Sequence, residues 1–337
     1  MRKRTISILL AALVLAGLMS ACGRVSEPEG NGEGERKLSI VATIFPEYDW
    51  VMNVLGERAK DVDVTLLLDS GVDLHSYQPT ADDMIRVSGC DLFICVGGVS
   101  DKWVADALKT AVNKDMIVLN LMELLGDAVR EEEVVEGMEA EHEEEEEAED
   151  EPEYDEHVWL SLNNAAVLCG AIRDALCALD AEHAEEYTAN TEAYLDKLAA
   201  LDGEYRAVVD GAPLDVVLFG DRFPFRYLTD DYGLTYYAAF VGCSAETEAS
   251  FETVTFLAGK VRELGLPVIL TLEGTDHRLA ETVAGASGVQ GVAILAMNSM
   301  QSVTMKDVRA GADYLNIMER NLNVLGQALG QYATVRE

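Results

Sequence analysis

Residues 181–209 read AEHAEEYTANTEAYLDKLAALDGEYRAVV, a stretch that contains no proline. Its large apolar side chains recur at spacings of three, four and seven residues, which is typical of one face of an α-helix; they are Tyr187, Tyr194, Leu198, Leu201 and Tyr205. At about 1.5 Å per residue such a helix is roughly 40 Å long. This length exceeds what one small domain needs. We therefore expect residues 181–210 to form a rigid helix that connects two lobes.

Short apolar stretches alternate with helical patterns on both sides of this helix. On the N-terminal side the predicted strands are residues 37–44, 62–68, 91–96 and 116–119. On the C-terminal side they are residues 214–219, 236–241, 267–272 and 292–296, and a helix over 313–329 closes the chain. Strands that alternate with helices at this spacing favour parallel βαβ units. The predicted fold class is α/β, with parallel-sheet lobes at residues 37–180 and 211–337.

The N-terminus resembles a lipoprotein signal. A basic start at residues 2–4 precedes an apolar run over 6–18 that is too short to span a bilayer comfortably. Small residues then stand directly before Cys22, which would carry the lipid and become the mature N-terminus. We expect a signal peptide over 1–22, a flexible tether over 23–36 and an extracytoplasmic protein anchored to the cell membrane. An ordinary cleaved signal peptide is the alternative.

Acidic residues dominate the segment 131–156, where 17 of 26 residues are Asp or Glu and one is His142. Such a density of like charge predicts a disordered, solvated insert. The whole chain has a formal charge of −36, which argues against binding to nucleic acid and is compatible with attraction of cations. Three interpretations of the insert stay open, namely a linker, a collector of cations and a docking surface for a partner.

Polar residues follow the predicted strands of both halves. In parallel α/β sheets the ligand crevice lies beyond the carboxyl ends of the strands. His75, Asp221 and Glu273 stand in such loops, and His157 ends the acidic insert just before a helix. Two imidazoles and two carboxylates would suit a divalent ion such as Zn²⁺ or Mn²⁺. The other cysteines show no CxxC spacing, so we expect buried free thiols, with a disulfide as the alternative.

Two of these loops resemble a known family. Residues 71–79 (GVDLHSYQP) and 155–160 (DEHVWL) are similar to the two first-lobe metal loops of the cluster A-I substrate-binding lipoproteins of zinc and manganese ABC transporters. The acidic insert resembles that family's variable charged loop, and the similarity covers nearly all of residues 37–335. It implies two α/β lobes bridged by one rigid helix, with the metal in the cleft and His75 and His157 as ligands.

The same resemblance implies that the second lobe supplies two more ligands. The third should follow the first strand of that lobe, where family members carry histidine for zinc or glutamate for manganese. Here Asp221 stands one residue away from the usual spacing to the aromatic pair. The fourth should be acidic, and Glu273 is our choice, with Asp276 and His277 as rivals. His142, Asp276 and His277 are also candidates for accessory metal binding.

The resemblance implies a monomeric solute-binding lipoprotein, not an enzyme, that captures Zn²⁺ and delivers it to a membrane ABC permease and its ATPase. Manganese (or iron) is the main alternative, because two histidines with two carboxylates is the pattern of Mn²⁺ members. A metallohydrolase is disfavoured because the sequence contains no HExxH motif and no recognisable nucleophile. A surface adhesin is a further alternative.

Overall fold

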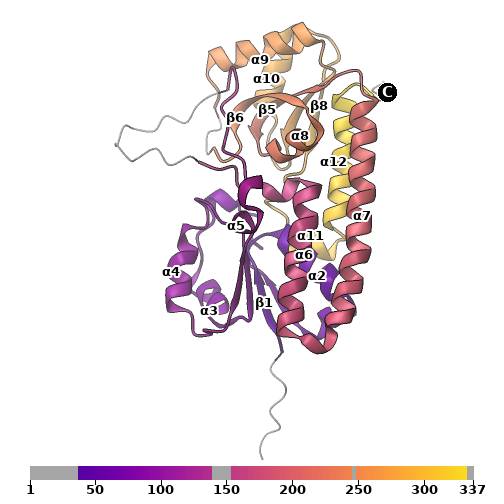
Figure 1. The fold of residues 1–337 in the computed structure, drawn as a ribbon. Coiled ribbons are helices and arrows are strands. Elements are labelled where there is room, and N and C mark those ends of the chain that lie inside the picture. The colour runs from indigo at the N-terminus through magenta and orange to yellow at the C-terminus, as the bar shows by residue number, and fades with distance from the viewer. Residues whose placement is uncertain (1–36, 139–152, 245–247, 332–337) are drawn as a thin grey trace, which may run out of the picture. The chain divides into compact units, whose positions relative to one another are not determined.

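The computed structural model describes residues 37–138, 153–244 and 248–331. All of its helices and strands lie in one compact unit that begins at Leu38 (Figure 1). The expectations for Cys22, for the signal peptide and tether at 1–36, and for His142 fall outside the described residues.

The first sheet is parallel and has the strand order β2-β1-β3-β4. Its strands are β1 (Ser39–Ala42), β2 (Asp63–Leu66), β3 (Leu92–Cys95) and β4 (Ile117–Asn120). The helices among and after them are α2 (Phe45–Leu55), α3 (Ala81–Gly89), α4 (Lys102–Thr110), α5 (Leu121–Leu125) and α6 (Leu162–Leu179). Every residue of β3 is buried, as expected for a parallel strand that is covered on both faces.

The second sheet is also parallel, with the order β6-β5-β7-β8. Its strands are β5 (Val216–Phe223), β6 (Thr235–Val241), β7 (Val268–Leu272) and β8 (Ala293–Met297). The accompanying helices are α8 (Arg226–Tyr232), α9 (Phe251–Leu264), α10 (Arg278–Ser287), α11 (Met305–Arg309) and α12 (Tyr314–Ala328). Strand β5 runs past the predicted end at Phe219, because a register shift between Phe219 and Arg222 lets it continue pairing with β6.

The long helix α7 spans Ala184–Asp210 and has 27 residues. It begins three residues later than predicted, since residues 181–183 form the 3₁₀ turn η5 (Ala181–His183). All five side chains of its predicted apolar face are buried. Its Asn190 donates to the carbonyl of Val54 in α2 (3.0 Å), and its Tyr205 donates to that of Met318 in α12 (2.7 Å). The predicted long helix is therefore confirmed; it packs against α2 and α12, and α12 runs beside α7 in Figure 1.

One hydrophobic cluster draws side chains from both halves of the chain. Within it, Trp159 donates to the carbonyl of Ser299 (2.8 Å), Tyr314 donates to that of Trp159 (2.6 Å), and Tyr314 meets Trp50 edge-on. Helix α6 is apolar enough to cross a membrane by length and composition, but it packs into this core with Leu168 fully buried. The domain boundaries at 180 and 211 stay a prediction.

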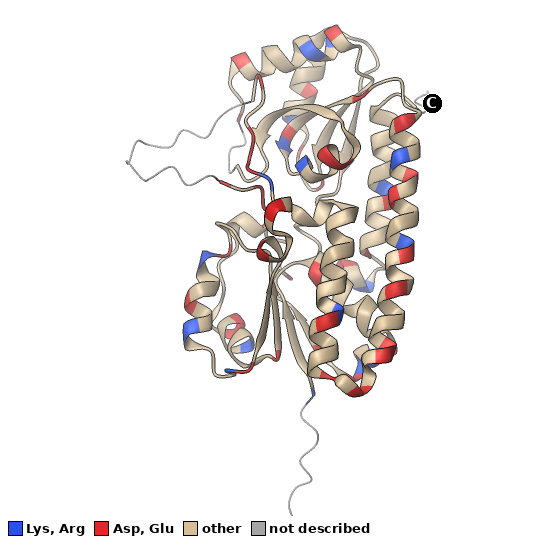
Figure 2. Cartoon of the chain, viewed as in Figure 1, with Lys and Arg blue, Asp and Glu red and all other residues tan. Residues whose placement is uncertain are grey.

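The acidic segment has ordered flanks. Glu131 pairs with Tyr154 in an antiparallel bridge, and Glu132 donates its N–H to the carbonyl of Glu153 (2.8 Å). The prediction of disorder over 131–156 is therefore wrong for the described residues 131–138 and 153–156, where backbone pairing offsets charge repulsion. Acidic side chains also occur along the helices around both sheets (Figure 2), so the negative charge is not confined to this segment.

Candidate metal centre

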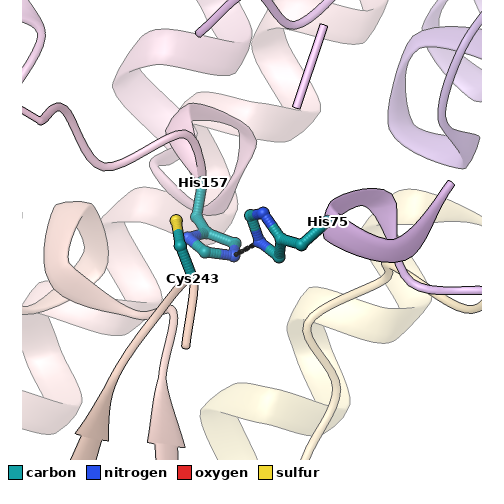
Figure 3. A group of neighbouring side chains, drawn as sticks. All are labelled: His75, His157 and Cys243. Atoms are coloured by element: carbon teal, nitrogen blue, oxygen red, sulfur yellow. Dashed lines mark hydrogen bonds between the residues drawn. The ribbon is translucent and has the colours of Figure 1, made fainter. Parts of the chain in front are cut away.

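The structure brings His75 and His157 together. His75 lies in the 3₁₀ turn η2 (Leu74–Ser76) after β2, and His157 directly precedes the turn η4 (Val158–Leu160). Their Nε2 atoms are 3.2 Å apart (Figure 3). Two nitrogens at about 2.0–2.1 Å from one tetrahedral zinc ion are separated by about 3.3 Å. The pair thus has the spacing of two ligands to one ion.

Asp155 fixes the orientation of His157. Its Oδ1 accepts from the backbone N–H of His157 (2.8 Å) and from Nδ1 (2.9 Å), while the ring is fully buried. A carboxylate can only accept, so Nδ1 carries a proton and Nε2 is left to face His75. Burial by itself lowers the pKa of His157, but the charge and hydrogen bond of Asp155 outweigh it, and the pKa is raised.

His75 has equivalent support from other residues. Its Nδ1 lies 2.8 Å from Ser100 Oγ and 3.4 Å from Glu156 Oε2, and Glu156 Oε1 accepts from Ser100 N–H (2.8 Å). Asp73 accepts from the backbone N–H of His75 (3.0 Å). Because both Nδ1 atoms are engaged, the Nε2 atoms are the ones that face each other, and binding of a metal ion at them competes with binding of a proton.

Cys243 is the third member of the group. One ligand atom each from His75, His157 and Cys243 lies within 4.8 Å of the others, and no other group of three or more His, Cys, Asp or Glu side chains this close occurs in the part of the chain described. Cys243 stands two residues beyond the end of β6. Its backbone N–H donates to Glu132 Oε1 (3.2 Å). Burial, and next the negative charge of Glu132, raise the pKa of the thiol, so the metal-free form is protonated.

The predicted carboxylate ligands Asp221 and Glu273 lie outside this group. Because β5 continues through Asp221, its carboxylate accepts backbone N–H groups from Arg222 (2.9 Å) and Leu272 (3.1 Å). Both oxygens of Glu273 accept from Ser299, at 2.8 Å each. The structure thus places a histidine pair with a cysteine nearby, and the ligand roles of Asp221 and Glu273 stay predictions.

The rivals of Glu273 are also placed elsewhere. Asp276 pairs with Arg278 (2.8 Å) at the surface, and His277 lies 2.9 Å from Thr271 through Nδ1. Both line a separate cavity of about 750 Å³, together with Asp221. No metal-binding arrangement connects them with the histidine pair in the described structure.

Sequence reasoning does not place Cys243 beside the histidine pair, because an isolated cysteine without CxxC spacing gives no metal-binding signal. The signal that could identify it is the rule already used for Asp221 and Glu273, that ligands lie beyond the carboxyl ends of parallel strands. Cys243 also follows the carboxyl end of a parallel strand, the place where ligands gather in such sheets.

A cavity of about 360 Å³ gives access to the centre. His75 and Cys243 line it, and so do three carboxylates, those of Glu132, Glu153 and Glu156. All three belong to the ordered flanks of the acidic segment, residues 131–138 and 153–156. A cation approaching the histidines therefore meets negative charge first.

Two parallel sheets, a long helix packed against α2 and α12, and a histidine pair at the strand ends define the metal-binding class of ABC substrate-binding proteins. Residues 40–328 match the profile of the family described as zinc-uptake complex component A, periplasmic, and the chain belongs to this family. Members of this family are solute-binding proteins without enzymatic activity.

Individual relatives agree with this assignment. The zinc-binding lipoprotein AdcA of Streptococcus pneumoniae is 31% identical over 97% of this chain, which spans 62% of that relative. The high-affinity zinc uptake system protein ZnuA of Bacillus subtilis is 28% identical over 93% of this chain and 94% of its own length. The solved Zn(II)-bound ZnuA-like domain of S. pneumoniae AdcA is 29% identical, with a TM-score of 0.67 over 87% of this chain and 99% of the domain.

Proposed function

We propose that this protein is the extracytoplasmic, monomeric zinc-binding component of an ABC uptake system, which delivers Zn²⁺ to a membrane permease and its ATPase. The observation that carries the proposal is the 3.2 Å separation of the Nε2 atoms of His75 and His157. The Nδ1 atom of each ring is held in place by a hydrogen bond, to Ser100 and Asp155 respectively. Relatives named as zinc-binding or zinc-uptake proteins support zinc as the cargo. That one of them is named a lipoprotein supports an anchor at Cys22.

In this proposal the chain binds its cargo and performs no chemistry on it. Zn²⁺ enters from the cavity and binds at the two facing Nε2 atoms, in competition with protons. Asp155 and Ser100 keep the rings oriented while the ion is bound. Manganese is the alternative cargo, because a set of two histidines and two carboxylates would suit Mn²⁺. That argument weakens because Asp221 and Glu273 are engaged elsewhere.

The test is metal analysis of the purified protein, followed by competition titration of Zn²⁺ against Mn²⁺. We expect His75→Ala and His157→Ala each to weaken zinc binding by more than about 100-fold, the upper end of the loss caused by removing only a supporting partner of a ligand. His183→Ala is the matched control, since His183 pairs with Asp180, lies partly exposed and is not a member of the candidate centre. Unchanged zinc affinity in the double variant His75→Ala/His157→Ala would refute the proposal. Tighter binding of Mn²⁺ than of Zn²⁺ by the unaltered protein would show that manganese is the cargo.

A further inference from the structure

We infer that Cys243 is a thiolate ligand of the transported ion, so that the site is built from two imidazole nitrogens and one sulfur. The inference rests on the proposed function and deepens it, because it names the chemical class of ion that the site selects. Thiolate is a soft ligand that suits Zn²⁺ and other thiophilic ions, whereas Mn²⁺ prefers carboxylate, carbonyl and water oxygens.

The first support is the placement of the Cys243 sulfur beside the ring of His157, whose Nε2 edge faces His75 (Figure 3). No pair of ligand atoms in the group is more than 4.8 Å apart. In a tetrahedral zinc site the bond to sulfur is about 2.3 Å and the bond to nitrogen about 2.0–2.1 Å, so the sulfur and each nitrogen would be about 3.6 Å apart. The upper limit of 4.8 Å exceeds this separation by about 1 Å, so the three side chains are close enough for small movements to bring them onto one ion.

The second support is Gly242, which lets the Cys243 turn approach His157. A Cβ atom at position 242 would lie 3.0 Å from His157 Cε1 and 2.9 Å from the carbonyl oxygen of Phe223. Both distances are shorter than ordinary van der Waals contact, so a side chain here would push the turn away from the ring. The close approach of the two loops depends on the absence of that side chain.

The third support is Arg222, which connects the Cys243 turn with the His75 turn. Its Nη1 donates to the carbonyl of Ser244, the residue after Cys243 (3.3 Å), and its Nη2 donates to Asp73 (2.9 Å). Asp73 in turn accepts from the backbone N–H of His75. One guanidinium therefore holds the loops of two ligands at a fixed separation.

Three protein ligands leave a fourth coordination position. His75 and Cys243 both line the cavity that also contains Glu132 and Glu156. The fourth position would then be filled from this side, by water or by a carboxylate. An open position is the feature that allows ligand exchange at a zinc ion. It suits a site that must release its ion to the permease.

The test uses Co²⁺ in place of Zn²⁺ on the purified protein, because thiolate bound to Co²⁺ gives a ligand-to-metal charge-transfer absorption in the near ultraviolet. We expect this band in the unaltered protein, and we expect Cys243→Ser to abolish it. Cys177→Ser is the matched control, since Cys177 is also half-buried but its sulfur contacts the carbonyl of Ala184. Competition titration should show that Cys243→Ser loses about 10-fold or more of the preference for Zn²⁺ over Mn²⁺.

Co²⁺ binding without the band in the unaltered protein would overturn the inference and leave the proposed function standing. The Co²⁺ measurement uses the unaltered protein, so it does not depend on whether Cys243→Ser folds. Unchanged preference for Zn²⁺ in a folded Cys243→Ser or Cys243→Ala variant would also overturn it. Failure of the unaltered protein to bind any divalent ion would overturn both the inference and the proposed function.

Discussion

The Nη2 atom of Arg222 lies 2.9 Å from the Oδ2 atom of Asp73. This ion pair joins β5 of the second sheet to the turn that carries His75 of the first half. Burial raises the pKa of Asp73, but His75 and then Arg222 outweigh this effect and hold the pKa below its ordinary value. Asp73 is therefore ionised at neutral pH, and it accepts hydrogen bonds from both the backbone N–H of His75 and the guanidinium of Arg222.

Removal of this ion pair should weaken zinc binding without abolishing it. In Arg222→Met the aliphatic stem remains, but the link between Asp73 and Ser244 is lost. We expect an affinity loss of about 10-fold, the lower end for supporting residues around a metal, measured by competition with a zinc chelator. Arg206→Met is the control, because Arg206 forms an exposed pair with Asp202 within α7. Equal affinities in the two variants would contradict the positioning role of Arg222.

Asp155→Asn should loosen the orientation of His157 and cost roughly 10- to 100-fold in zinc affinity. The chain offers a close control. Asp180 lies 2.9 Å from His183 Nδ1, the same distance as Asp155 from His157 Nδ1, but it lies outside the candidate centre. Asp180→Asn should leave the affinity unchanged. A similar effect of both substitutions would show that the loss reflects general destabilisation.

Zinc binding should weaken as pH falls, starting above the ordinary histidine pKa of about 6.5. The reason is that the folded-state pKa of His157 is raised, so protons compete with the ion at higher pH than for a free imidazole. For the metal-free protein the sign is opposite. A raised histidine pKa contributes stability that is present at low pH and lost as pH rises through the folded-state value. Affinity measured between about pH 5 and 8 should shift to a lower midpoint in Asp155→Asn.

The metal-free protein should lose stability as pH rises from 4.5 to about 8 because of Glu47. Burial raises the pKa of this carboxyl from 4.5 to about 8, with Asp101 adding to the effect. The folded state therefore holds a proton that the unfolded chain releases, and ionisation destabilises the fold by an amount on the order of a few kcal/mol. Denaturant unfolding at pH 5 and pH 9 measures the difference.

Glu47→Gln isolates this effect. The Glu47 carboxyl accepts from the N–H groups of Thr43 (2.7 Å) and Ile44 (3.2 Å), and an amide oxygen can accept the same hydrogen bonds. We expect a flatter dependence of the free energy of unfolding on pH in this variant. An unchanged slope would mean that other buried carboxyls, such as Asp49 with a pKa raised to about 7, dominate.

Glu132→Gln should slow zinc capture more than it weakens binding. The substitution keeps an acceptor for Cys243 N–H but removes one negative charge from the cavity. Loss of electrostatic attraction lowers association rates and their dependence on salt. Stopped-flow capture at low and high salt measures this, with Glu57→Gln as a control because Glu57 is 91% exposed on its side chain. An unchanged rate would contradict an electrostatic role of the cavity.

The predictable parts of this protein are those that follow from local sequence. The helix face around Tyr187 and Tyr205 and the strand–helix alternation depend on periodic burial, which the sequence displays directly. His75 and His157 could be paired because both stand in loops with a specific resemblance to a family. Their spatial proximity confirms that pairing, while their ligand role stays a prediction.

The parts that failed depend on contacts between distant segments. Asp221 was placed in a loop, but pairing of β5 with β6 continues past it and turns its carboxylate to backbone donors. The ordered flanks of the acidic segment depend on hydrogen bonds between residues on either side of 139–152. The position of Cys243 follows from the packing of Gly242 against His157, which is separated from it by 85 positions in the chain (242 − 157). None of these contacts leaves a periodic trace in the sequence.

In both His75 and His157 the backbone N–H donates to an aspartate two positions earlier in the chain. The distances are 3.0 Å from His75 to Asp73 and 2.8 Å from His157 to Asp155. These turns form when the chain folds, so the conformational entropy of the two imidazoles is lost before any ion arrives. Preorganisation of this kind lowers the ordering cost of binding itself. Recognition should then be governed by the exchange of bound water and protons for ligand atoms, with little contribution from the search for a binding-competent shape.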